Sequence, residues 1–205
     1  MSFIVFVVVI AVIIWIVYAH MGWLGLGGSR SNVPTDVPNT DLQPAKLSWR
    51  AVDRSHDGFT IDMPSDASEQ QIPAYNVTGG AEEMEMLVAM PNAETTYAIA
   101  WDDNPPVERA SDEAVERTLD NARDGALART HTTLTGETKA SYLGYPARNF
   151  TGRNDNGGFF DARLILAGKK LYMMIAAFPA ASARRDEDVN HFFDSLKLNS
   201  GAHGE

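Results

Sequence analysis

Cysteine is absent from this chain of 205 residues. Its fold therefore cannot depend on disulfides, and neither thiolate catalysis nor lipid attachment to an N-terminal cysteine is possible. Basic residues are also scarce, because 17 lysines and arginines stand against 27 aspartates and glutamates, which makes the formal net charge −10. An acidic surface repels nucleic acid and anionic lipid headgroups, so we expect neither as a partner.

Several catalytic and metal-binding motifs are missing too. The chain has no G-x-S-x-G nucleophile elbow and no H-E-x-x-H zinc motif, and its five histidines stand far apart. The segments Asp102-Asp103-Asn104 and Asn154-Asp155-Asn156-Gly157 lack calcium-loop spacing, and we interpret them as turns. We therefore predict a non-enzyme with no metal and no cofactor. An enzyme whose acid and base meet only in the folded chain is an alternative.

The N-terminus, in contrast, carries a long apolar run. No charged side chain occurs from Phe3 to Ala19, a stretch that includes Ile10 and Trp15. At about 1.5 Å per residue it spans roughly 26 Å as a helix, close to the hydrocarbon core of about 30 Å. We predict that residues 1–26 form a single-pass transmembrane anchor, with the lipid bilayer as its partner.

A cleaved signal peptide is the alternative for this segment. Val17-Tyr18-Ala19 has side chains that a signal peptidase accepts, but only Met1 and Ser2 precede the apolar run, so the basic region of a signal is missing. A retained anchor is therefore favoured. We expect the C-terminal domain to be extracytoplasmic, in the periplasm, although few flanking charges define this orientation.

Composition divides the remainder of the chain. Glycine, proline, serine and threonine predominate in residues 27–46, which we interpret as a flexible linker. Residues 47–199 have the length of one domain, and residues 200–205 are expected to be a disordered tail. A domain of this size buries enough surface to fold without a disulfide or a metal.

Apolar residues that alternate with a period of two predict strands with one buried face. This pattern is found in four segments, at Phe59–Met63, Met84–Met90, Tyr97–Trp101 and Phe160–Leu166. The segment around Tyr172 is apolar at consecutive positions, as in a central strand that is covered on both faces. Turn residues predict hairpins at 152–158 and 166–170.

Helical spacing appears at residues 111–129, with Ser111 as the N-cap, and at residues 184–196. Strands in succession, interrupted by single helices, favour an α+β fold over a doubly wound parallel sheet. We predict a mainly antiparallel sheet with helices packed on both faces, an α/β/α sandwich that follows the transmembrane helix.

Several motifs carry a family resemblance. They are the strand Gly58–Pro64, the Gly144-Tyr145-Pro146-Ala147 segment after the first helix, the strand ending at Leu171-Tyr172, and the final Phe192-Phe193-Asp194-Ser195-Leu196. This layout resembles the PsbP-like α/β/α sandwich, over residues 48–198. The resemblance implies a fold used to bind and assemble other proteins, with no catalytic residues to transfer.

Together these features predict a membrane-anchored module that binds a protein partner at or near the membrane. Tyr75, Tyr145 and Phe159 lie beside glycines or in predicted loops, where aromatic anchors of an interface occur, and we take them as a possible partner surface. The methionines at Met84, Met86 and Met90 are interpreted as core. An exported small-ligand-binding domain, in which these methionines line a pocket, is the alternative.

Overall fold

A computed structural model describes residues 46–75, 81–92, 95–103 and 111–199. Within these ranges, no helix combines the length and the apolar character that crossing a bilayer requires. The predicted anchor, with Phe3, Ile10, Trp15 and Ala19, lies outside the described residues. So do residues 27–45 of the predicted linker and the predicted tail.

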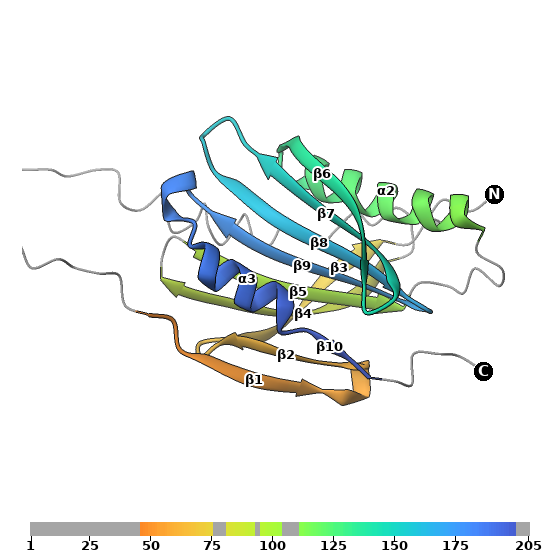
Figure 1. The fold of residues 1–205 in the computed structure, drawn as a ribbon, viewed down its shortest axis with the longest axis horizontal. Coiled ribbons are helices and arrows are strands. Elements are labelled where there is room, and N and C mark those ends of the chain that lie inside the picture. The colour runs from red at the N-terminus through yellow and green to blue at the C-terminus, as the bar shows by residue number, and fades with distance from the viewer. Residues whose placement is uncertain (1–45, 76–80, 93–94, 104–110, 200–205) are drawn as a thin grey trace, which may run out of the picture.

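A seven-stranded antiparallel sheet forms the middle layer (Figure 1). Across the sheet, its strands are β3 (Ser68–Tyr75), β4 (Ala81–Asn92), β5 (Thr95–Asp103), β9 (Lys170–Phe178), β8 (Phe159–Ala167), β7 (Tyr145–Arg153) and β6 (Thr133–Tyr142). Both predicted hairpins form, because β7 pairs with β8 and β8 pairs with β9. In the first turn, the Asn154 side-chain oxygen accepts hydrogen bonds from the backbone N–H of Asn156 and Gly158.

Helix α2 (Asp112–Arg129) covers one face of this sheet. Its predicted N-cap is confirmed, since the Ser111 hydroxyl accepts a hydrogen bond of 3.3 Å from the backbone N–H of Ala114. The alternating residues of β4 and β8 that were predicted to be buried face this helix, apart from Met90, which is half-buried and lies outside the cluster. The buried cluster contains Met84, Met86, Val88, Phe160, Ala162, Leu164 and Leu166. Leu119, Ala122 and Ala126 complete it from α2.

The opposite face carries helix α3 (Asp186–Asp194) and a second sheet (Figure 1). This antiparallel sheet has the order β1 (Trp49–Arg54), β2 (Phe59–Pro64), β10 (Lys197–Leu198). A 3₁₀ turn, η1 (Ser55–Asp57), joins β1 to β2, and a second, η2 (Ala181–Ala183), lies between β9 and α3. The buried cluster on this face contains Phe59, Ile61, Met63, Tyr97, Ile99, Trp101, Val189, Phe192 and Phe193.

The α/β/α prediction is therefore confirmed in its main features, with helices on both faces of an antiparallel sheet. Strand β9 alternates between the two clusters, with Met173 on the α2 side and Tyr172 on the α3 side, as the continuous apolar run predicted. The prediction of a single sheet was wrong, because β1, β2 and β10 form a second one. A period of two identifies a strand and its buried face, but it does not assign the strand to a sheet.

Candidate functional site

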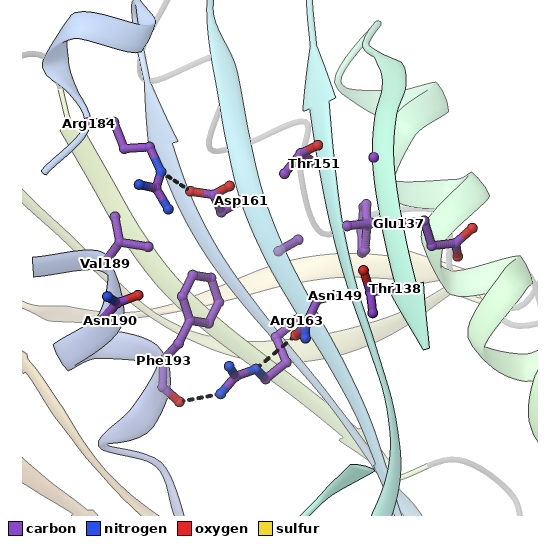
Figure 2. A pocket seen from close by; sticks show the side chains of 13 residues that line it. Glu137, Thr138, Asn149, Thr151, Asp161, Arg163, Arg184, Val189, Asn190 and Phe193 are labelled. Carbon is purple, nitrogen blue, oxygen red and sulfur yellow. Dashed lines mark hydrogen bonds and ion pairs between the residues drawn. The ribbon is translucent and has the colours of Figure 1, made fainter. Parts of the chain in front are cut away.

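A groove of about 300 Å³ lies between α3 and the outer part of the large sheet (Figure 2). Strands β6, β7 and β8 form its floor, and the segment from Arg184 to Phe193 forms its wall. Its polar lining includes Thr138, Asn149, Thr151, Asp161, Arg163 and Asn190. In Figure 1, β6, β7 and β8 lie on one side of α3 and the small sheet lies on the other.

Strand register brings these polar side chains together. Asn149 lies opposite Thr138 on one side and opposite Arg163 on the other, while Thr151 lies opposite Asp161. Residues directly opposite each other project from the same face of an antiparallel sheet. The floor is thus a polar row across three strands whose sequence positions are up to 25 apart, from 138 to 163.

The Arg163 guanidinium is held on several sides. It donates to the Asn149 side-chain oxygen at 3.0 Å and to the Phe193 carbonyl oxygen at 2.7 Å. Its central carbon lies 4.8 Å from the ring centroid of Tyr142 and 5.2 Å from that of Phe193. Arg163 therefore joins the end of α3 to the sheet, and its charge is compensated within the chain.

A second arginine, at the other end of the groove, is paired with a carboxylate. Arg184 donates from Nε to the Asp161 carboxylate at 2.7 Å (Figure 2). With both arginines engaged, the groove offers mainly the hydroxyls and amides of Thr138, Thr151 and Asn190. Such a lining suits neutral hydrogen-bonding groups, such as peptide amides, better than a free anion.

A buried arginine that no sequence motif indicated lies on the other face of the same strands. The Arg148 side chain is 2% exposed and forms ion pairs with Glu116 and Asp120 of α2 and Glu137 of β6, the last at 2.7 Å. Arg123 also contacts Glu137, at 2.6 Å. Arg148 lies two residues before the buried Phe150, so the two side chains project from the same face of the strand. This spacing is the sequence signal that indicates the burial of Arg148.

These contacts change the pKa values of the network. Burial alone raises the pKa of Glu137, but hydrogen bonds from Arg148 and Arg123 outweigh it and hold this pKa below its usual value. For Arg148, burial lowers the pKa, while hydrogen bonds to Glu137 and Asp120 raise it overall. Glu137 and Arg148 are thus both stabilised in their charged forms, which is typical of a structural ion pair.

A histidine beside a carboxylate occurs elsewhere, between α3 and β2. His191 Nε2 lies 3.1 Å from the Asp62 carboxylate, and the Trp49 ring lies 4.6 Å from the imidazole. The two side chains are 42% and 37% exposed and belong to neither cavity described here. This contact therefore links α3 to β2.

A second cavity, of about 750 Å³, opens beside the start of β1. Half-buried Met90 lines it, whereas Met84 and Met86 lie in the core. Its wall contains the buried Asp188, whose carboxylate lies 3.1 Å from Arg185 Nε. Burial and the charge of Asp188 raise the pKa of Tyr97, which also lines this cavity.

The aromatic residues predicted as a partner surface lie in separate places. Tyr145 is half-buried at the start of β7. Phe159 begins β8 at the opposite end of this strand pair, where it lies opposite Arg153 and stacks on Phe178 at a centroid distance of 5.3 Å. Tyr75 ends β3, and its side chain lies outside the described part of the chain. Tyr145 and Phe159 do not line the groove.

This layered arrangement is an α+β domain with a PsbP-like fold. Among solved structures, the chain is similar to cyanobacterial PsbP (CyanoP) from Synechocystis sp. PCC 6803, with a TM-score of 0.50 and 11% identity over 76% of this chain and 95% of that one. At this identity the similarity shows the fold alone. No protein-family model and no curated protein matches the chain.

Two other solved structures are similar with lower scores. The Ran-binding protein Mog1p of Saccharomyces cerevisiae has a TM-score of 0.43 and 11% identity, over 78% of this chain and all of that one. A putative regulator of unknown function, PA94 from Pseudomonas aeruginosa, has a TM-score of 0.32 and 12% identity, over 68% and 86% of the two chains.

Proposed function

We propose that this protein is a non-catalytic membrane-anchored module whose extracytoplasmic domain binds a partner protein through the groove beside α3. The observation that carries the proposal is the groove itself, with its neutral hydrogen-bonding lining and its internally compensated arginines. An extended segment of a partner presents backbone amides, which Thr138, Thr151 and Asn190 can bind.

The apolar run from Phe3 to Ala19 and the linker after it support the anchored arrangement. A linker of about 20 residues extends at most to roughly 3.3–3.6 Å per residue, so the domain can reach partners several tens of ångströms from the bilayer. The bilayer is the second partner in this proposal, through the N-terminal helix.

Anchoring is tested on the full-length protein in intact cells. We expect an N-terminal mass that includes Met1 or Ser2, and cleavage of the domain by protease added from outside. A chain beginning near His20 would contradict the anchor, and a domain protected from external protease would contradict the extracytoplasmic location.

Partner binding is tested by a photo-crosslinking amino acid at Asn190, an exposed groove residue. The matched control carries the same amino acid at Arg117, whose side chain is 60% exposed on α2. We expect a defined protein adduct from position 190 alone, with the partner identified by mass spectrometry and confirmed by crosslinking from its own side. Equal adducts from both positions, or none from position 190, would contradict the proposal.

A further inference from the structure

Strand β6 forms one border of the large sheet, and its outer edge is unpaired in the described part of the chain. The strand is ten residues long and almost entirely exposed. An exposed edge strand is a template for pairing with another chain, and proteins usually protect it with short length, proline or covering elements. Proline is absent from β6. Helix α2 packs over β7 and β8 and contacts β6 through the ion pairs Arg123–Glu137 and Glu116–Lys139.

Exposed apolar side chains lie near both ends of this strand. Leu134 is 37% exposed near its start, and Leu143 is 61% exposed immediately after its end. They are the large hydrophobic residues that are exposed in the described part of the chain. Leu143 also has a φ of 52°, a left-handed conformation that is unfavourable for leucine.

The hairpin that follows β6 determines which backbone groups face outward. Tyr142 and Tyr145 close a two-residue turn, in which Leu143 and Gly144 both have positive φ as in a type I′ turn. Tyr142 therefore bonds to β7, and in an antiparallel pair the bonded positions alternate. Glu137 and Lys139 consequently direct their backbone N–H and C=O groups to the free edge.

We propose that a second copy of this chain pairs with β6 in antiparallel orientation, with the two-fold axis between the two Thr138 residues. Glu137 of each copy then lies opposite Lys139 of the other, and both form hydrogen-bonded pairs. Opposite charges across a strand pair are favourable, whereas like charges directly opposite each other are unfavourable.

Neighbouring registers are disfavoured by the same charges. A shift of the axis to residue 137 places Glu137 opposite its own copy, and a shift to residue 139 does the same to Lys139. Moving the axis by one residue shifts the strand register by two. Only even register shifts are possible, because only alternate residues present free backbone groups at this edge. The sequence of β6 is thus self-complementary about Thr138.

This pairing accounts for the exposed leucines and extends the groove. Leu134 and Leu143 lie at nearly equal distances along the strand from Thr138, so each leucine of one copy approaches the opposite end of β6 in the other. The two sheets become continuous, and the axis is perpendicular to them, so both α3 grooves open on one face. Dimerisation does not depend on the identity of the groove's partner.

The absence of cysteine allows a direct test in the full-length protein. In the variant Thr138→Cys, the two sulfurs would lie in a non-hydrogen-bonded pair with Cα atoms about 4.5 Å apart, which permits a disulfide. In Ser141→Cys, position 141 of one copy would be about 20 Å from position 141 of the other, since six residues separate it from its opposite residue. Arg117→Cys is the second control, at an exposed position of α2.

Under mild oxidation, we expect Thr138→Cys to form a covalent dimer at least tenfold faster than either control. Equal rates for the three variants, or no dimer from Thr138→Cys, would overturn the proposed pairing. Association through the leucines without strand pairing would give equal rates, because it does not bring position 138 of one copy close to position 138 of the other.

A second pair of variants tests the backbone edge. Lys139→Pro and Lys139→Ala both remove the lysine charge, but only proline removes the outward N–H. We expect sedimentation to show a monomer for Lys139→Pro and a retained, weaker dimer for Lys139→Ala. An equal dimer in both variants would contradict pairing through this edge.

Discussion

Arg148 is a charged residue at a position that an apolar side chain would usually occupy. Its guanidinium is buried under α2 and compensated by Glu116, Asp120 and Glu137, which come from α2 and β6. These carboxylates are between 25% and 42% exposed, so they retain part of their hydration. The network therefore links helix and sheet at the border of the core. Its desolvation cost comes mainly from the buried arginine.

Replacement of the arginine alone is expected to be destabilising. We predict that Arg148→Met lowers the free energy of unfolding by about 3 kcal/mol, the lower end of the cost of breaking a buried ion pair, because three carboxylates lose their shared cation. Urea unfolding followed by tryptophan fluorescence measures the change. Arg117→Met on exposed α2 is the control and should cost less than about 0.5 kcal/mol. Equal stability of the Arg148→Met and wild-type proteins would contradict this role.

The same network predicts a pH dependence. Because the folded-state pKa of Glu137 is lowered, its ionisation stabilises the fold above the unfolded-state pKa of about 4.3, and this contribution is lost as pH falls through the folded-state pKa. We predict that Glu137→Gln is less stable than wild type at pH 7 and that the difference shrinks below pH ~4.3. Urea titrations at several pH values measure it. A difference that is constant with pH would argue against the ion pairs.

The β6–β7 hairpin illustrates a conflict within a single element. Its turn requires positive φ at Leu143 and Gly144, and glycine satisfies this requirement without strain, whereas leucine does not. Asparagine followed by glycine is the preferred sequence for a type I′ turn. A leucine that is both strained and exposed is thus unfavourable for the isolated chain, as expected for a residue that contacts a second molecule.

We predict that Leu143→Asn stabilises the protein by about 1 kcal/mol, because asparagine tolerates the left-handed conformation. Thermal unfolding is measured in the Lys139→Pro background, which the proposed pairing predicts to be monomeric, and it should shift upward by several degrees. Leu143→Ala removes the same apolar group but retains the strain, so it should give little or no increase. A destabilised Leu143→Asn variant would show that the leucine side chain contributes to the fold of the monomer.

At the scale of the whole molecule, the core consists of two clusters separated by the large sheet. Helix α3 supplies Val189, Phe192 and Phe193 to one of them, and the Tyr142 hydroxyl donates to the Leu196 carbonyl oxygen at 2.8 Å just beyond the helix. The C-terminal segment is therefore part of the core and also the wall of the groove. Loss of this segment should affect stability and binding together.

Truncation tests this coupling. We predict that deletion of residues 186–205, which removes α3 and β10, exposes the cluster around Phe59 and abolishes cooperative unfolding, because several fully buried side chains are lost. Binding of the dye ANS and the loss of a sharp thermal transition are the measurements. Deletion of residues 200–205 alone is the control and should leave both unchanged. A cooperative transition in the longer deletion would contradict the prediction.

The local pattern of the sequence determined much of this architecture. A period of two predicted β2, β4, β5 and β8 and one buried face of each, helical spacing predicted α2 and α3, and turn residues predicted two hairpins, because these signals depend on residues close together in the chain. The prediction of only one buried face was wrong for β4, β5 and β8, since Leu87, Ala98 and Ile165 bury their other faces. The cap at Ser111 is local in the same sense.

The tertiary structure decided which strands are neighbours and what lies on their outer faces. The second sheet, the burial of Arg148 and the polar row of the groove depend on the pairing of segments far apart in sequence, and no local period specifies that pairing. Edge strand β6 was missed for a related reason. Nearly all its side chains are exposed, so it has no apolar alternation, and only its hydrogen bonds to β7 make it a strand.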